Sequence, residues 1–486
     1  AAGAGLRAVS ALPFFAGGRR LTSANHLIVE DKHSGRPLER VCLADAAAID
    51  AAIASAVAAR PALLALPAWR RRDILLALAG GIAARRERFA ELLIREAGKV
   101  RRDAEAEVQR AIQTFELAAG EALRQEGRIF ELGTYPHDEG RRAYWRRVPV
   151  GVASFITPFN FPLNLVAHKV APAIAAAVPF VLKPASLTPL CALELGGLLA
   201  ACDLPPGSFA ILPARRDGAE AFSADPRLSL LSFTGSDEVG FALKARAAHM
   251  RVVLELGGNA AAILCADWPL EDAAERIARG AFGQAGQSCI SVQRALVDRR
   301  VAAPFTERLL AEARRYVHGD PDDRETRLGP LISRAEAERL EAWVHEAVSR
   351  GARLLLSGER QGARFPALVL TDVPRDCRLY QGEAFGPVLI LETFDDLGQA
   401  IAAVNHSRYG LQAGLFSDSQ SAIERCWSEL EVGGLIVGDV PTWRSDAMPY
   451  GGVKASGQGR EGPRFAIEDL TEPRLLVLPT ARPGRG

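Results

Sequence analysis

The sequence has almost no net charge, because its 486 residues include 59 Lys and Arg against 58 Asp and Glu. This balance gives no electrostatic reason to expect nucleic acid or an anionic membrane surface as a partner. We also see no run of the roughly 18 apolar residues that a membrane-spanning helix needs, so no membrane partner is expected. What remains is a chain of ordinary globular composition, which is too long for one hydrophobic core and should form at least two domains.

The sequence also lacks paired cysteines. Its seven Cys are an odd number, and none forms a Cys-x-x-Cys pair or clusters with His. The pattern argues against a structural zinc site, and we predict no bound metal. Scattered thiols in a long chain are typical of a reducing compartment, which predicts a cytoplasmic protein. Residues 1–15 are mildly apolar without a basic leader, and we interpret them as a processed N-terminus rather than a signal peptide.

Apolar spacing predicts an α/β protein. Residues 75–93 and 105–123 have helical spacing and are expected to form amphipathic helices on the outside of the fold. From Val148 short apolar runs alternate with helical segments, which predicts a doubly wound parallel sheet. We expect strands at 148–156, 180–182, 208–212 and 228–233, and helices at 164–177 and 187–201. The alternation restarts after Gly257, so a second α/β unit is expected over roughly 258–455.

Residues 128–147 interrupt the first unit with aromatic residues set among charges and turn residues, a pattern that predicts a β-hairpin. One interpretation is an ordinary surface hairpin. The other is an edge strand that awaits a partner subunit. Near the C-terminus, residues 474–478 form a second short apolar strand.

One cysteine differs from the rest. Cys289 lies in a polar loop that contains Gly283 and Gly286, between a predicted helix and a predicted strand. Such a loop lets backbone amides approach a reacting atom, and an exposed thiol there can become a nucleophile. The alternative is an inert thiol, which is the usual state of a cysteine in such a chain.

Glu255 is the candidate base, because it ends an apolar strand just before Gly257 and Gly258. A carboxylate between two leucines is desolvated, which raises its pKa toward the range of a general base, or it is turned into a cleft. The alternative is a strand-end Glu that pairs with an Arg.

Two turns could bind anions. Asn160 stands between two Phe at a strand-to-helix turn, where its amide can donate to an oxyanion or can cap the helix. Ser236 follows a strand in Phe233-Thr-Gly-Ser, where a helix N-terminus can bind a pyrophosphate or the serine can act as a simple N-cap.

Together these residues resemble the NAD(P)-dependent aldehyde dehydrogenase superfamily over most of the chain. The motifs that carry the resemblance occur in the family's order: Ile156-Thr-Pro-Phe-Asn-Phe-Pro-Leu-Asn, Leu182-Lys-Pro-Ala-Ser-Leu-Thr-Pro, Phe233-Thr-Gly-Ser, Leu254-Glu-Leu-Gly-Gly-Asn, Gly286-Gln-Ser-Cys, Glu383-Ala-Phe-Gly-Pro-Val and Met448-Pro-Tyr-Gly-Gly-Val-Lys-Ala-Ser-Gly. The spacing of Glu255 and Cys289 also matches.

The resemblance implies a mechanism. Cys289 attacks the aldehyde as a thiolate, and Asn160 with the Cys289 backbone N–H holds the oxyanion. After hydride transfer to NAD(P), Glu255 activates the water that hydrolyses the thioester. Lys169 is implied to lie between Glu255 and the cofactor as part of a polar relay. Because the branch that transfers its acyl group to coenzyme A lacks this Glu, the expected product is a free carboxylic acid.

The resemblance also implies a cofactor site. Lys183 contacts the adenosine ribose, Ser236 the pyrophosphate and Glu383 the nicotinamide ribose. The further cofactor-binding residues implied by the motifs are Thr157, Pro158, Ser186, Phe233, Gly235, Leu256 and Phe385. NAD-preferring members often carry Glu where Ser186 stands, and Ser does not repel a 2′-phosphate. NAD is therefore expected first, with NADP a possible alternative.

The family fold implies three parts. Residues 1–127 and 148–257 form a Rossmann-like dinucleotide-binding domain, and 258–455 form the catalytic domain. Residues 128–147 and 456–486 form a bridging element that assembles a homodimer or homotetramer. Two departures from the family pattern stand out: Gly438 replaces the usual Asn, which we expect to loosen the substrate-side backbone, and Ala177 with Val178 replaces a common Gly-Asn pair.

The substrate is expected to be a small polar aldehyde, because residues 439–446 look like the branch that acts on lactaldehyde and phosphonoacetaldehyde. Arg444 then meets an anionic tail, or it forms an ion pair at a surface or interface. Phe161 and Ser288 are the other expected substrate contacts. Members that bind phosphate often carry Arg where Ser288 stands, which argues against a phosphorylated substrate.

Two rival functions use the same sequence features. A catalytically silent relative serving as a binding or structural protein would be expected to lack Cys289 or Glu255, and both are present. Cofactor-free hydrolysis of esters or thioesters could use both residues. Dependence of turnover on NAD(P) separates this hydrolase from a dehydrogenase.

Overall fold

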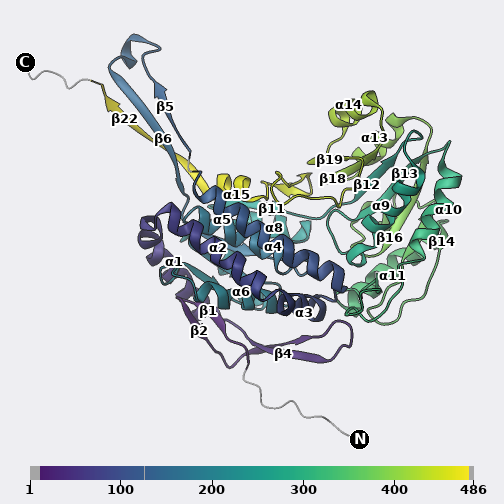
Figure 1. Ribbon diagram of the computed structural model, residues 1–486, viewed down its shortest axis with the longest axis horizontal. Coiled ribbons are helices and arrows are strands. Elements are labelled where there is room, and N and C mark those ends of the chain that lie inside the picture. The colour runs from purple at the N-terminus through teal and green to yellow at the C-terminus, as the bar shows by residue number, and fades with distance from the viewer. Residues whose placement is uncertain (1–10, 125, 481–486) are drawn as a thin grey trace, which may run out of the picture.

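The computed structural model describes residues 11–124 and 126–480. Two lobes each surround their own β-sheet, and a long arm of strands projects from the first lobe (Figure 1). The predicted α/β class with parallel sheets is confirmed. Most of the segment interpreted as a processed N-terminus lies outside the described residues.

The first lobe contains an eight-stranded sheet of order β2-β1-β9-β8-β7-β10-β11-β21. The strands are β1 Phe14–Ala16, β2 Arg19–Leu21, β7 Val152–Ile156, β8 Phe180–Lys183, β9 Phe209–Ile211, β10 Leu228–Thr234, β11 Arg251–Glu255 and β21 Gly457–Gln458. The central strands β7 to β11 run parallel, and their register pairs Ile156 with Lys183 and Thr234 with Glu255. Their carboxyl ends therefore meet at one edge of the sheet, where ligands bind in open α/β folds.

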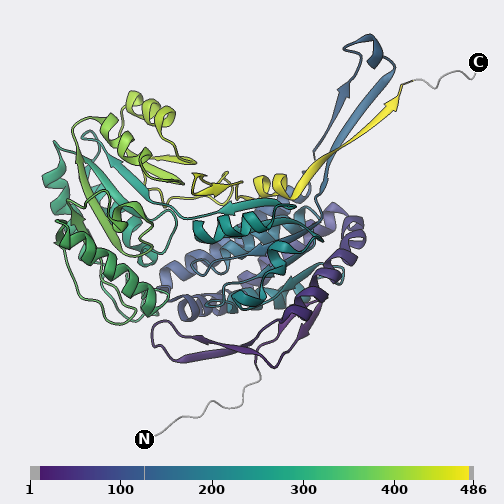
Figure 2. The same ribbon diagram turned by 180° about the vertical axis from the view of Figure 1, so that it is seen from behind.

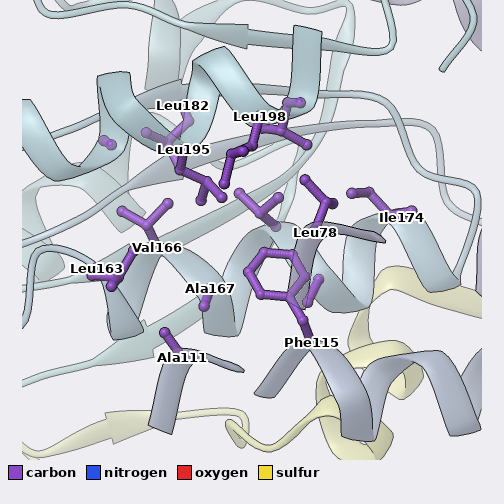
Figure 3. Packing of buried hydrophobic residues seen from close by; sticks show 14 of the residues in the cluster. Leu78, Ala111, Phe115, Leu163, Val166, Ala167, Ile174, Leu182, Leu195 and Leu198 are labelled. Atoms are coloured by element: carbon purple, nitrogen blue, oxygen red, sulfur yellow. The ribbon is translucent and has the colours of Figure 1, made fainter. Parts of the chain in front are cut away.

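Helices cover both faces of this sheet. They are α1 Ala46–Ala65, α2 Ala68–Ala84, α3 Arg86–Ala97, α4 Arg101–Ala122, α5 Asn164–Ala175, α6 Leu190–Ala200, α7 Ala221–Ala224, α8 Asp237–Arg246 and α15 Pro463–Leu470. Figure 3 shows the core, in which Leu78 of α2, Phe115 of α4, Ala167 of α5 and Leu195 of α6 pack together. A short β-ribbon of β3 His26–Glu30 and β4 Pro37–Cys42 lies below (Figure 1).

One predicted helix and one predicted strand were wrong in detail. The helix expected at 75–93 is two helices, because Arg85 leaves helical geometry between α2 and α3. The strand expected at 148–156 breaks at Gly151, whose φ of +143° brings it against Ser229, where a Cβ would clash. Helix α4 is amphipathic, as predicted: Phe115 is buried against α2 and α5, whereas Arg102, Gln113 and Glu116 are exposed.

Helix α1 also differs from expectation. By length and composition it is apolar enough to cross a membrane, although we expected no such segment. In the structure one face of α1, including Ile49, Ile53 and Leu63, is buried, and the helix contacts β7 and β8 of the first sheet. A core helix of a globular domain has the same composition.

The second lobe contains a seven-stranded sheet of order β14-β15-β16-β13-β12-β18-β19, all parallel except β14. Its strands are β12 Ala260–Leu264, β13 Val292–Asp298, β14 Arg353–Leu356, β15 Leu368–Thr371, β16 Val388–Phe394, β18 Gln412–Phe416 and β19 Gly434–Val437, with a separate pair of β17 Tyr409–Gly410 and β20 Val453–Lys454. Its helices are α9 Leu270–Phe282, α10 Ala302–Ala313, α11 Arg334–Ser349, α12 Arg378–Gln381, α13 Leu397–Asn405 and α14 Gln420–Glu429.

The arm consists of β5 Gly127–Glu131, β6 Arg141–Pro149 and β22 Thr471–Pro479, in the order β22-β6-β5 (Figures 1 and 2). The predicted hairpin and C-terminal strand thus pair with each other. Residues 457–470, which the sequence analysis placed with the bridging element, instead lie with the first lobe, since β21 pairs with β11 and α15 packs on α4 and α5.

Candidate active site

Cys289 is presented by a sharply turned loop that follows α9. Gln284, Ala285 and Gly286 all have left-handed backbone, with φ of 54°, 53° and 67°. A Cβ at position 286 would overlap the carbonyl of Gly386, so only glycine fits there. The turn leaves Cys289 half-buried, with its Sγ 3.0 Å from the hydroxyl of Tyr450. Burial raises the pKa of the Cys289 thiol, and the Tyr450 hydrogen bond opposes this rise.

Glu255 ends β11 and is 3% exposed. Neither carboxylate oxygen has a hydrogen-bond partner among the described residues, and no Arg pairs with it there. Burial, followed by the nearby Glu461 carboxylate, raises the pKa of Glu255 well above its usual value. The alternative of a strand-end Glu paired with Arg is therefore not observed. A buried carboxyl without partners is suited to accept a proton from a water molecule.

Gly257 and Gly258 lie where two parts of the site approach each other most closely. A Cβ on Gly258 would overlap the carbonyl oxygen of Cys289, and a Cβ on Gly257 would lie 2.6 Å from a Glu383 oxygen. The Gly258 amide donates to Glu383 over 2.9 Å. Burial raises the pKa of Glu383 to about 7. The glycine pair thus lets the chain that follows Glu255 contact both Glu383 and the loop that carries Cys289.

Asn160 follows β7 and is buried beside the loop that carries Cys289. Its side-chain amide donates to the Gln287 carbonyl over 3.0 Å, and its own Oδ1 has no partner among the described residues. It does not cap α5, because the Glu107 carboxylate accepts the amides of Leu163 and Asn164 at that helix start. The capping alternative is therefore wrong. The Asn160 amide instead contacts Gln287, which is two residues before Cys289 in the sequence.

Residues at the start of α4 and just before it connect the Asn160 turn with the loop that carries Cys289. Sequence reasoning missed this connection. The buried Lys99 ammonium lies 2.8 Å from Glu107 and donates to the Gln284 side chain. Asp103 accepts the Gln284 amide over 3.0 Å, and Gln284 in turn donates to the Asn160 carbonyl. The four-residue spacing of positions 99, 103 and 107 was the available signal, but it also fits an ordinary amphipathic helix.

Ser236 stands at the N-cap of α8 without making a side-chain capping bond. Nearby, the buried hydroxyl of Thr234 has no partner among the described residues. The plain capping role is therefore not observed. Free hydroxyls and helix amides at the carboxyl edge of a parallel sheet are suited to bind phosphate groups.

Lys183 ends β8, and Ser186 donates to the Ala214 carbonyl over 3.4 Å. Burial, and then the charge of Arg216, lower the pKa of Lys183. The exposed Arg216 thus lies within electrostatic range of Lys183, and it was not anticipated from the sequence.

Lys169 is buried near Glu255. Its ammonium donates to Ser232 over 2.8 Å and lies 3.9 Å from Glu461, whose carboxylate helps to raise the pKa of Glu255. It does not line the cleft that holds Cys289. The buried charges of Lys169, Glu461 and Glu255 thus interact with one another, and a place for Lys169 in a relay between Glu255 and the cofactor stays a prediction.

Arg444 is buried rather than at a surface, which rules out the surface-pair alternative. Its guanidinium lies 2.9 Å from Glu461 and stacks 3.7 Å from the centre of the Tyr450 ring. Asp446 sits beside it and also binds Arg110 of α4 over 2.7 Å. Although burial opposes it, hydrogen bonds from His168 and Arg110 hold the pKa of Asp446 well below its usual range.

A cleft of about 620 Å³ lies between the two lobes, and most of the groups described above line it. The predicted site residues that line it are Pro158, Asn160, Phe161, Gly235, Ser236, Glu255, Leu256, Ser288, Cys289, Glu383, Phe385 and Arg444. The predicted site residues outside this lining are Thr157, Lys169, Lys183, Ser186 and Phe233. A thiol and an unpaired carboxylate share this one cavity.

Comparison with known proteins identifies the family. The model of the aldehyde dehydrogenase family matches residues 21–476. The chain belongs to the aldehyde dehydrogenase family. A 3-sulfolactaldehyde dehydrogenase from Priestia aryabhattai is 41% identical over 460 residues, which are 94% of this chain and 96% of the relative.

Two solved structures show the same fold as this aldehyde dehydrogenase. Aldehyde dehydrogenase 21 from Physcomitrella patens, in complex with the reaction product succinate, has a TM-score of 0.95 and 40% identity, covering 97% of this chain and 99% of the other. The NADP-dependent glyceraldehyde-3-phosphate dehydrogenase from Bacillus halodurans, complexed with NADP, has a TM-score of 0.94 and 29% identity, covering 97% and 100%. The predicted activity, oxidation of an aldehyde with NAD(P), is confirmed.

The residues of this aldehyde dehydrogenase fit a dinucleotide. The unpaired hydroxyl of Thr234 and the free N-terminus of α8 can meet a pyrophosphate, and the buried Glu383 carboxylate can meet ribose hydroxyls. Gly438, where the family usually has Asn, has φ of +73°. That left-handed geometry favours Gly and is also found for Asn, and Gly438 is not among the residues that line the cleft. The expected loosening of the substrate-side backbone stays a prediction.

Proposed function

We propose that this aldehyde dehydrogenase oxidises a small aldehyde with an anionic tail to the carboxylic acid, with Cys289 as nucleophile and Glu255 as base. The observation that carries the proposal is the shared cleft, which holds the thiol, the partnerless carboxylate and two arginines, Arg110 and Arg444. The pairing of a nucleophile with a separate base suits a reaction in two steps.

In the first step the Cys289 sulfur attacks the aldehyde carbon and forms a thiohemiacetal. The Asn160 amide lies at the nucleophile loop and can transfer its hydrogen bond from the Gln287 carbonyl to the new oxyanion. NAD(P), when bound, supplies the hydride acceptor. The residues available to hold it are Ser236 at the pyrophosphate, Glu383 at the ribose and Phe385 beside the ring, all of which line the same cleft.

In the second step Glu255 takes a proton from water, and the resulting hydroxide attacks the Cys289 thioester. Both Glu255 oxygens are free of protein partners in the described structure, so a water can use either. The raised pKa makes this carboxylate a stronger base than an exposed Glu. Water as acyl acceptor gives a free acid as product.

The anionic tail is supported by the two arginines. Arg110 donates from Nε and Nη2 to Asp446, whereas Arg444 donates from Nη2 to Glu461 and its Nε lies 3.7 Å from Asp446 without a hydrogen bond. The Nη1 of each arginine makes no hydrogen bond to the described residues. A bound anion could accept from both groups. The relatives reported above act on 3-sulfolactaldehyde or glyceraldehyde 3-phosphate or release succinate, all of which carry an anionic group. Ser288 beside the thiol favours a carboxylate or sulfonate over a phosphate.

Arg110→Gln should therefore lower kcat/KM for anionic aldehydes roughly 10- to 100-fold, the value of one charge-assisted hydrogen bond. Succinic semialdehyde and neutral butyraldehyde, which have the same chain length, form a matched pair for steady-state assays. The kcat/KM for the neutral aldehyde should fall much less.

Arg102→Gln is the control, because Arg102 lies on the same helix but is exposed and outside the cleft. It should leave both substrates unaffected. An equal loss for the charged and the neutral aldehyde in Arg110→Gln would refute recognition of the tail.

NADP acceptance is supported at the adenosine end. Lys183 and Arg216 present two positive charges there, and Ser186 replaces the carboxylate that would repel a 2′-phosphate. Arg216→Ala should lower kcat/KM for NADP roughly tenfold or more, with little change for NAD. Arg215→Ala, a change in the adjacent exposed arginine, is the control. If both cofactors were affected equally, Arg216 would have no role at the 2′-phosphate.

Assembly into a homodimer or homotetramer is supported by the arm. Its strands carry exposed apolar side chains, among them Ile129, Phe130, Leu475 and Leu476. An exposed strand edge with apolar side chains is a template for pairing with another copy. Leu475→Glu with Leu476→Glu should shift the mass in sedimentation experiments toward the monomer. An unchanged mass, or a monomeric parent chain, would contradict this assembly.

The predicted cytoplasmic location remains a proposal. All seven cysteines are free thiols. Free thiols, two of them only half-buried besides Cys289, suit a reducing compartment.

A further inference from the structure

The only hydrogen bond that the Cys289 sulfur makes to a described side chain is to Tyr450, with Sγ and Oη 3.0 Å apart. The tyrosine is 3% exposed and its hydroxyl makes no other hydrogen bond to the described residues. Its backbone is fixed by a bridge to Glu461, with the Tyr450 amide 3.1 Å from the Glu461 carbonyl. The hydroxyl is therefore held against the reacting atom by the main chain.

A positive charge covers one face of the Tyr450 ring. The Arg444 guanidinium lies 3.7 Å from the ring centre and is itself bound to Glu461 over 2.9 Å. A guanidinium on the π face draws electron density from the ring and strengthens the phenol as a hydrogen-bond donor. Burial raises the pKa of Tyr450 well above its usual value, so the phenol stays neutral and keeps its hydrogen.

The sulfur needs such a donor. Burial raises its pKa most, the negative charges of Glu383 and Glu255 raise it further, and the charge of Arg444 offsets only part of this rise. No Lys or His of the described residues is bonded to the sulfur. A thiolate in these surroundings forms only if a hydrogen bond compensates for lost water. Tyr450 is the side chain in position to provide it.

We propose that Tyr450 is a catalytic residue that donates its phenolic hydrogen to the Cys289 thiolate and so sets the fraction of reactive sulfur. The thiol proton leaves to solvent, and Tyr450 keeps its own proton. When the sulfur–carbon bond forms, the negative charge moves to the aldehyde oxygen, and the hydrogen bond to the then neutral sulfur weakens. The inference deepens the proposed function, because it rests on Cys289 as the nucleophile.

This role has a measurable kinetic consequence. A hydrogen bond to an ionised group is strong enough to shift the thiol ionisation roughly 10- to 100-fold. Nucleophilicity falls by about half as much on a logarithmic scale when the thiol becomes more acidic. The net gain in thiolate reactivity at neutral pH is therefore roughly 3- to 15-fold.

The test is alkylation of the free enzyme by iodoacetamide from pH 6.5 to 10.5, without aldehyde or cofactor, followed at the Cys289 peptide by mass spectrometry. Tyr450→Phe should react roughly 3- to 15-fold more slowly near pH 7. A fluorinated tyrosine at position 450, which is a stronger donor of nearly the same size, should react faster than the parent chain. Tyr380→Phe, which removes a buried hydroxyl bonded to Glu392 outside the cleft, should match the parent.

Equal rates for Tyr450→Phe and the parent near pH 7 would overturn the proposal. Slower alkylation of both the Phe and the fluorotyrosine enzymes would also overturn it, because that result indicates a packing role instead. The assay needs no turnover, so its outcome is separate from that of the steady-state assays with aldehydes.

Discussion

Cys289→Ala is expected to abolish aldehyde-dependent NAD(P) reduction, lowering kcat by roughly four orders of magnitude or more. The thiol is the proposed nucleophile in the cleft, and without it no thiohemiacetal forms from which hydride could leave. Pre-steady-state measurement should show neither a burst nor steady turnover.

Cys265→Ala is the matched control, since Cys265 is a half-buried free thiol outside the cleft. It should keep the parent rate. Retention of more than a few per cent of activity by Cys289→Ala would remove the thiol from the mechanism. Ester hydrolysis that proceeds at full rate without NAD(P) would favour the cofactor-free hydrolase.

Glu255→Gln should separate the two steps of the reaction. The amide has nearly the same shape but cannot accept the proton of water, so acylation proceeds and deacylation slows. We expect a burst of about one reduced cofactor per site, followed by a steady rate reduced roughly 10²- to 10⁴-fold. Rapid mixing with absorbance detection measures both phases.

The pH dependence gives a second signature. A base must be ionised to act, so the steady rate of the parent should fall as pH drops through the raised pKa of Glu255. Glu255→Gln should lack this dependence. Glu275→Gln, at an exposed position of α9, should retain both the parent rate and its pH profile. An unchanged steady rate in Glu255→Gln would contradict the assignment.

The sequence predicted what is local in the chain. The alternation of strands and helices located the sheets, and the loop around Cys289 and the strand ending at Glu255 carried their own signals. The glycine pair at 257–258 indicated a close backbone approach, which the structure places at Cys289 and Glu383.

What could not be predicted depends on contacts distant in sequence. Lys99 meets Gln284 across 185 positions, and Arg110 meets Asp446 across 336. Tyr450 is one aromatic residue among many until the fold brings it to the sulfur. Helical periodicity also cannot show where one helix ends and the next begins, which is why α2 and α3 were predicted as one helix.

The proposed mechanism requires that Cys289 carries the acyl group. Mass spectrometry of Glu255→Gln, quenched within one turnover with aldehyde and NAD(P), tests this requirement most directly. The Cys289 peptide should gain the mass of the acyl group, and the adduct should be cleaved by hydroxylamine as a thioester. An acyl group on a different residue, or a reduced cofactor formed with no adduct on Cys289, would contradict the account.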